Sequence, residues 1–420
     1  MDAAIEGGPW IDSAKPTTAA RALFVGILLL MAGNGLQGAL IGVRSEGEGF
    51  GVATAGVIMA CYFAGFLVGS RWAESLISQV GHIRVFAGLA STASTAVLVH
   101  ALFITPVTWG AMRFVTGMCM AGLYVVAESW LNDLATNETR GRLLSIYMVV
   151  TMGGMTIGQF LLDAADPDGF KLFMLSSVLV SASLVPVALS ASSSPPLAVP
   201  EPMSLRELYK IVPTGIFVSF WNGAAVGVLI GLGAVYAVAV DVPDSRIPVF
   251  LAAPLIGSVL LQWPIGYVSD RVSRRAVMFG VALAASVACV ALVSAPEGSW
   301  TAIVLMLVLG AASFPIYSLT IAFTADWLPQ SKLIAGSASL VRINGVGALF
   351  GPLVAAAAMA FTAPEAFFWV MAGANLIIVG YLGYRMVVKD ALPIERQSRF
   401  VAFPARASAV AANLITRRKR

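Results

Sequence analysis

The sequence predicts an all-α membrane protein whose twelve transmembrane helices form two pseudo-symmetric six-helix bundles. Three observations support this prediction. The composition is too apolar for a water-soluble domain, apolar runs of membrane-spanning length recur along the whole chain, and the basic residues gather in alternate connections between those runs.

Composition alone favours a lipid environment. Of the 420 residues, 58% are hydrophobic and only 11% are charged, and the mean hydropathy is +0.86. Average soluble domains carry roughly 25% charged residues. A water-soluble chain could not bury this much apolar surface, whereas lipid tails solvate it.

The cysteines and histidines suggest no metal or disulfide chemistry. Cys61, Cys119 and Cys289 lie inside apolar segments without metal-ligand spacing. His82 and His100 are few and far apart, and we interpret both as interfacial or helix-end residues. We therefore expect no metal and no cofactor.

Twelve apolar runs are long enough to cross a hydrocarbon core of about 30 Å. The first six are expected at 22–42, 51–70, 84–104, 108–130, 143–162 and 170–190. The second six are expected at 211–240, 247–267, 276–295, 300–326, 333–360 and 365–388. The seventh run is long and rich in glycine, so we expect it to tilt or break.

A serine- and proline-rich stretch divides the chain near its middle. The expected organisation is an N-terminal tail at 1–21, a six-helix bundle at 22–190, a linker at 191–210, a second bundle at 211–388 and a basic tail at 389–420.

The basic residues predict the orientation. Most of the 26 lysines and arginines fall in the tails, the linker and alternate connections, and the opposite side holds only Arg44, Lys171 and Arg246. The positive-inside rule then places both termini in the cytoplasm. The tail that ends in TRRKR is expected to contact anionic lipid, and we expect no nucleic-acid partner.

The two halves repeat each other at an offset of about 193 positions. Gly154-xxx-Gly158 corresponds to Gly347-xxx-Gly351-Pro352. The loop that runs from Gly266 to Arg275 corresponds to the stretch between the second and third runs, where Ser78 and Gln79 stand in place of Asp270 and Arg271.

These motifs resemble those of the major facilitator superfamily. The run G-x-x-x-D-R-x-x-R-R at 266–275 is similar to its signature loop, and Arg113-xxx-Gly117 looks like its second motif. Ala127-Glu128-Ser129, Arg140-Gly-Arg142 and Gln262-Trp-Pro-Ile-Gly266 resemble the YcaD-like branch. The resemblance covers nearly all of 20–390 and implies two bundles around a central cavity, working as a monomer in a bacterial inner membrane.

The loop at 266–275 is a candidate gate. A carboxylate at Asp270, where a helix reaches the cytoplasm, could accept hydrogen bonds from a neighbouring helix end and from an arginine. The candidate gating residues are Gly266, Asp270, Arg271, Arg274 and Arg275. The alternative is an ordinary solvated loop that obeys the positive-inside rule.

Ionisable residues within spans are costly and are therefore functional candidates. Arg113 lies early in the fourth run and Arg342 near mid-depth in the eleventh, and both are expected to face the interior. One hypothesis is that the two arginines bind an anionic solute or tune a proton site. The alternative is that they have a structural role between helices. Glu128 lies about 22 Å along the helix from Arg113. It belongs to a proton pathway, or it is an interfacial carboxylate near Arg140 and Arg142.

Further polar residues are predicted to line a cavity near the midplane. They are Asn34, Gln37, Tyr62, Tyr147, Trp221, Asn222 and Gln262. The small residues Gly154, Gly158, Gly347 and Gly351 permit close helix contact, and Pro352 permits a bend. In the superfamily, a motif of this kind marks exchangers coupled to proton entry, although plain packing explains the glycines equally well.

No nucleotide-binding or hydrolase motif is present, so an enzyme is not expected. The leading hypothesis is secondary active transport of a small organic solute by alternating access, with a proton as coupling ion and export favoured over import. The alternative is a non-transporting membrane sensor or assembly factor with the same fold.

Overall fold

A computed structural model describes residues 16–136, 139–189, 203–388, 392–394, 397 and 400. Within these residues there is no β-strand, and 12 helices are long and apolar enough to span a membrane. The predicted fold class is confirmed. Because twelve is even, the first span begins and the last span ends at the same side of the membrane. We call this side the terminal face and the other side the distal face.

The first half contains α1 (Pro16–Gly47), α2 (Gly51–Val80), α3 (His82–Leu102), α4 (Pro106–Leu134), α5 (Arg140–Phe160), the 3-10 turn η1 (Leu161–Ala164), α6 (Lys171–Ala182) and α7 (Leu184–Leu189). A short α8 (Leu205–Ile211) precedes the second half. That half contains α9 (Pro213–Ala239), η2 (Asp244–Arg246), α10 (Ile247–Ser269), α11 (Arg274–Val293), α12 (Trp300–Trp327), η3 (Gln330–Lys332), α13 (Leu333–Phe361) and α14 (Ala366–Val388).

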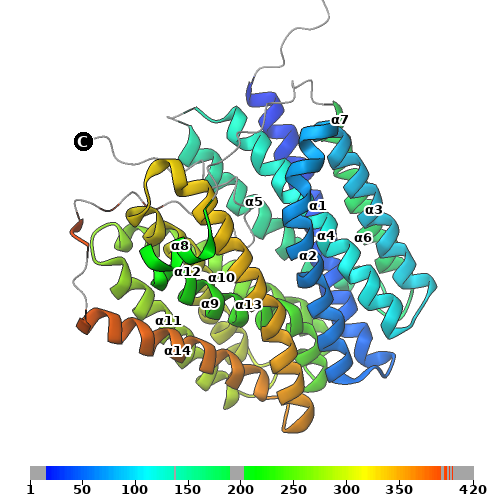
Figure 1. Ribbon diagram of the computed structural model, residues 1–420. Coiled ribbons are helices and arrows are strands. Elements are labelled where there is room, and N and C mark those ends of the chain that lie inside the picture. The colour runs from blue at the N-terminus through cyan, green and yellow to red at the C-terminus, as the bar shows by residue number, and fades with distance from the viewer. Residues whose placement is uncertain are drawn as a thin grey trace, which may run out of the picture.

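Each half folds as a six-span bundle with the same internal neighbours (Figure 1). In the first bundle α1 packs on α5, α2 on α4, and α3 on α4 and α6. In the second bundle α9 packs on α13, α10 on α12, and α11 on α12 and α14. The repeated pairing explains why the sequence motifs recur at a constant offset.

The two bundles meet through α2 with α13, α5 with α10, and α1 with α9. Two close approaches across this seam lie towards the distal face, and another, between Gly345 of α13 and the Leu67 side chain of α2, lies nearer the terminal face. A Cβ built at Gly42 would overlap the Ala234 side chain, and one built at Gly56 would overlap the Ala356 side chain. The distal ends of the two bundles are therefore closely packed together.

The seventh span was predicted to tilt or break, and a break is not observed. Helix α9 runs without interruption from Pro213 to Ala239. Its glycines serve close packing instead, since a Cβ built at Gly223 or Gly227 would overlap the backbone of α13. The sixth span is the one that is interrupted, at Ser183 between α6 and α7.

Part of the predicted linker is helical. Helix α8 begins at an N-cap, where the Ser204 hydroxyl accepts a hydrogen bond from the Glu207 N–H. The Glu207 carboxylate pairs with the Lys332 ammonium at the start of α13. Residues 190–202, the first 15 residues and most of the basic tail lie outside the described residues.

Candidate functional site

A small cavity lies between the two bundles, in the half of the membrane nearer the distal face. Its volume of about 50 Å³ has room for a few water molecules and for no larger solute in this conformation. The polar residues that line it are Asn34, Tyr62, Arg113 and Gln159, and its apolar wall includes Phe63, Met155, Leu229, Ile230, Leu255 and Phe314.

Arg113 supplies the charge of this cavity, whose described lining contains no acidic residue. Its side chain is buried, with its guanidinium carbon 4.5 Å from the centroid of the Tyr62 ring and its Nη2 3.8 Å from the Met59 sulfur. Arg113 thus lies on the inner side of α4, where the sequence suggested it. A buried cation beside an aromatic face and an apolar wall favours a negatively charged ligand.

The two amides of α1 differ in position, although both were predicted to line a cavity. Asn34 lines the cavity, while Gln37 is fully buried and lies outside the cavity lining. Among the described residues, neither polar atom of the Gln37 amide has a hydrogen-bond partner. Gln159, from α5, lines the cavity, and its Oε1 is likewise buried without a partner among those residues.

A second polar group lies on the same bundle, towards the terminal face. The hydroxyl of Tyr147 on α5 donates a 2.8 Å hydrogen bond to Oε1 of Glu128 on α4, and both side chains are fully buried. Tyr317, on α12 of the other bundle, is close enough to interact electrostatically with Glu128. A buried carboxylate therefore lies at the seam between the bundles, apart from Arg113.

The remaining predicted lining residues of the second bundle make contacts within that bundle. Asn222 donates to the Ser313 carbonyl at 2.9 Å, and Gln262 donates to the Ser318 hydroxyl at 2.7 Å. Trp221 packs against Phe220, with ring centroids 5.3 Å apart. None of these three residues is in the lining of the cavity around Arg113.

Arg342 lies apart from Arg113. Its side chain is exposed, and it lines a groove of about 730 Å³ between α2, α4 and α13 in the half of the membrane nearer the terminal face. Both arginines within spans were expected to face the interior. Arg113 lies there, whereas the Arg342 side chain faces this groove. Helix periodicity in the sequence could not fix which side of α13 faces the seam.

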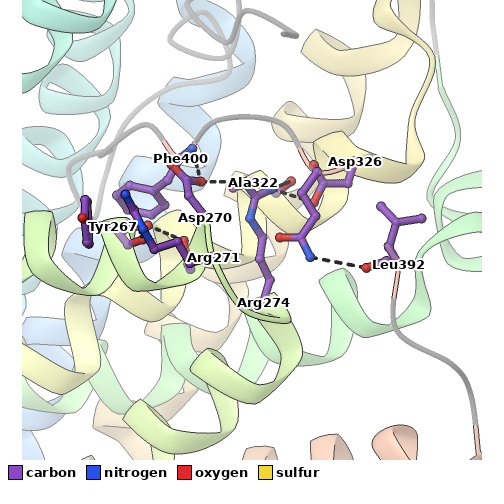
Figure 2. Close-up of polar contacts among 11 residues, drawn as sticks. Tyr267, Asp270, Arg271, Arg274, Ala322, Asp326, Leu392 and Phe400 are labelled. Carbon is purple, nitrogen blue, oxygen red and sulfur yellow. Dashed lines mark hydrogen bonds and ion pairs between the residues drawn. The ribbon is translucent and has the colours of Figure 1, made fainter. Parts of the chain in front are cut away.

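The predicted gating loop forms an ion network at the terminal end of the second bundle (Figure 2). Arg274 Nη1 lies 2.6 Å from Asp326 Oδ2 and donates to the Ala322 carbonyl at 2.9 Å, and its Nη2 lies 3.4 Å from Asp270 Oδ1. The Arg274 and Asp326 side chains are only 1% and 2% exposed. This buried pair ties α11 to α12.

The C-terminal segment joins this network. The Phe400 N–H donates a 2.8 Å hydrogen bond to Asp270 Oδ1 (Figure 2), and the Phe400 ring occupies the space that a Cβ on Gly266 would need. Gly266 therefore accommodates an aromatic ring. No motif in the sequence indicated Phe400.

The other two loop arginines stack on aromatic rings. The Arg271 guanidinium lies 3.3 Å from the centroid of the Tyr267 ring on α10. The Arg275 guanidinium lies 5.5 Å from the centroid of the Phe323 ring on α12. Such cation–π contacts hold the loop against the helices that flank it.

The predicted small-residue motifs lie where helices of one bundle approach most closely. A Cβ on Gly154 or Gly158 would overlap the backbone of α1, and one on Gly347 or Gly351 would overlap the backbone of α9. Pro352 lies inside α13, which continues through it to Phe361. The motif thus has a packing role in both bundles.

The two-bundle fold with a charged cavity between the bundles defines a membrane transporter architecture. Comparison with known proteins identifies the family. The profile of the Major Facilitator Superfamily matches residues 214–419. The chain is also 26% identical over 361 residues to the MFS-type transporter YcaD of Escherichia fergusonii, which covers 84% of this chain and 92% of that protein. The chain belongs to the major facilitator superfamily of transporters.

Solved structures share the fold. The nucleoside transporter NupG, in a mutant form, superposes with a TM-score of 0.73 at 12% identity, covering 87% of this chain and 99% of NupG. The human organic anion transporter MFSD10 superposes with a TM-score of 0.59 at 13% identity, covering 88% of this chain and 100% of that one. At these identities the likeness concerns the fold alone.

Proposed function

We propose that this protein is a secondary active transporter. It moves a small organic anion by alternating access, and it couples this movement to the movement of protons. The observation that carries the proposal is Arg113, a buried cation in a cavity that both bundles line and whose described lining has no acidic residue.

The packing of the bundles supports a conformation closed at the distal face. The seam between α1 and α9 and between α2 and α13 is tight there, while the groove beside Arg342 opens nearer the terminal face. We propose that the terminal face is cytoplasmic, because the basic residues gather on that side. The described conformation is then the inward-facing one.

Glu128 is the proposed proton carrier. A carboxylate can take up and release a proton, and its burial at the seam links its charge to the relative position of the bundles. Its Tyr147 partner stabilises the charged form, and Tyr317 belongs to the opposite bundle, which moves during transport. Protonation of Glu128 would therefore change the balance between the two conformations.

The direction proposed is export. The Gly347-xxx-Gly351-Pro352 run on α13 supports it, because this run resembles the motif of proton-coupled exchangers. In this scheme protons enter down their gradient as the solute leaves.

The test uses purified protein in two steps. Thermal-shift screening against organic anions and matched neutral compounds should yield a stabilising anion, because a ligand that binds the folded state raises its stability. Arg113→Gln should remove that shift. Arg84→Gln is the matched control, because Arg84 is an exposed arginine outside the cavity.

Flux in proteoliposomes then tests coupling. The wild-type protein should accumulate the anion against its gradient when a pH gradient is imposed. Glu128→Gln should still exchange labelled for unlabelled anion but should lose accumulation driven by pH. Accumulation that persists in Glu128→Gln would assign the proton to another group, and stabilisation by neutral compounds alone would refute the anionic substrate.

A further inference from the structure

The groove between α2, α4 and α13 has chemistry of its own. Its walls are the apolar side chains of Leu67, Val68, Met118 and Val346, and its charged residues are Arg71 and Arg342, with Trp72 beside them. The volume of about 730 Å³ is far larger than that of the cavity around Arg113. The groove therefore offers an apolar surface with positive charge at one end.

Both arginines face the groove without a protein anion. Each side chain is exposed, and within the described part of the chain neither guanidinium has a hydrogen-bond or ion-pair partner. Two like charges that share a site repel each other unless an anion lies between them. The groove lacks an acidic side chain among its described lining residues, so an anion from outside the protein would complement its charge.

The depth of the arginines matches the headgroup region of one leaflet. Arg71 lies close to the terminal-face end of the span Gly51–Ala73. Arg342 lies about 10 Å into the span that starts at Ala335, and the length of its side chain lets the guanidinium reach back towards the interface. Trp72 is 48% exposed, as is typical of tryptophan at the membrane–water boundary.

We infer that the groove between α2 and α13 binds an anionic glycerophospholipid, with the phosphate between Arg71 and Arg342 and an acyl chain along the apolar wall. Charge complementarity selects the headgroup, since basic pockets between transmembrane helices attract anionic lipid. The bound lipid would lie between α2 and α13, which form the seam between the bundles. This inference does not depend on the identity of the transported solute or on proton coupling.

The experiment measures lipid at the groove itself, because the basic tail also attracts anionic lipid. The full-length protein is reconstituted in bilayers that contain dibrominated phosphatidylglycerol or dibrominated phosphatidylcholine with the same chains. Bromine quenches nearby tryptophan fluorescence. The protein has nine tryptophans, so the Trp72 signal is obtained by subtracting the Trp72→Phe variant from each protein.

We expect Trp72 to report a preference for phosphatidylglycerol over phosphatidylcholine of roughly tenfold, since each arginine near the surface adds to anionic lipid binding. Arg71→Gln with Arg342→Gln should reduce the preference to about one, and each single variant should reduce it in part. Arg84→Gln, an exposed arginine near the start of α3 on the same face, should leave the preference unchanged.

Three outcomes would overturn the inference. The first is equal quenching of Trp72 by both lipids in the wild type. The second is a preference for phosphatidylglycerol that survives in the double variant. The third is a loss of this preference in Arg84→Gln that is as large as the loss in the double variant. Glycerol phosphate added in solution should not relieve the quenching. Relief by this soluble anion would show a simple anion site, as would be expected for a solute entry point, and would also overturn the lipid assignment.

Discussion

The connection between α2 and α3 and the connection between α10 and α11 occupy equivalent places in the two bundles, yet they are held by different chemistry. In the first bundle His82 Nε2 lies 2.9 Å from the Ser129 hydroxyl, and the His82 ring packs beside Trp130. In the second bundle Arg275 lies over Phe323, at the positions that correspond to His82 and Trp130, and Arg274 forms the buried ion network beside it.

The comparison shows that the repeat retains the helix contacts while the polar groups at the contact have diverged. Ser78 and Gln79, which stand in place of Asp270 and Arg271, form hydrogen bonds within their own helix turn. We expect the two connections to differ in how much they contribute to the free energy of unfolding. A buried ion pair makes each partner depend strongly on the other, whereas a neutral hydrogen bond makes a small net contribution.

Arg274→Ala should have the largest effect. The change removes the Arg274 guanidinium from a buried ion pair with the Asp326 carboxylate, and breaking a buried pair in this way typically costs about 3–5 kcal/mol. The measurement is the free energy of unfolding in detergent. The double variant Arg274→Met with Asp326→Leu should recover most of the loss, because it removes both buried charges, and the Asp270 carboxylate that remains is partly exposed. A loss below about 1 kcal/mol in Arg274→Ala would show that the pair is solvated.

The small residues provide a prediction in which the two bundles should behave alike. Gly158→Ala and Gly351→Ala each force a Cβ into the backbone of the neighbouring helix, and overpacking of this kind costs about 1–3 kcal/mol. The control variants are Gly153→Ala on α5 and Gly373→Ala on α14, where a Cβ meets nothing within 4 Å.

The controls should be neutral or slightly stabilising in the same unfolding assay, since alanine favours helix over glycine. The matched pair Gly158→Ala and Gly351→Ala should differ by less than about 1 kcal/mol. A larger difference would show that the helix packing of the two bundles has also diverged. The two connections would then not be the only place where the bundles differ in energy.

His82→Ala should have a smaller effect than either change above. It removes one neutral hydrogen bond to Ser129 together with part of the packing against Trp130, and the net value of such a bond is about 1 kcal/mol. The thermal midpoint of the purified protein, measured beside that of Arg274→Ala, reports the difference. Equal losses would mean that the two connections contribute alike and that the ion network adds no extra coupling.

The spans could be predicted from the sequence because lipid imposes one requirement on every helix, namely a long apolar run, and because basic residues segregate. Arg113 could be predicted because a charge in such a run stands out. The apolar wall of the cavity could not, since Phe63 and Phe314 look like any other lipid-facing or packed residue. The side of α13 on which Arg342 lies depends on how the bundles pack, which hydropathy does not encode.

Phe400 shows the same limit, because its contact with Asp270 joins positions 130 residues apart in the chain. Phe400→Ala should therefore give the smallest change. The ring is only partly buried, so its removal should cost about 1 kcal/mol or less. Asp270→Ala should in turn raise hydrogen–deuterium exchange at the Phe400 amide, because that amide loses its acceptor, while His82→Ala should leave this exchange unchanged.

These two variants decide what holds the terminal end of the second bundle. If the Arg274–Asp326 pair holds this end, Phe400→Ala leaves the free energy of unfolding nearly unchanged. Asp270→Ala then frees the Phe400 amide, but it lowers the free energy of unfolding by less than Arg274→Ala does. If Phe400→Ala costs as much as Arg274→Ala, the C-terminal segment is an integral part of the network. The first bundle contributes no such terminal segment to its loop among the described residues, so the difference between the halves would then originate in the tail and not in the loop.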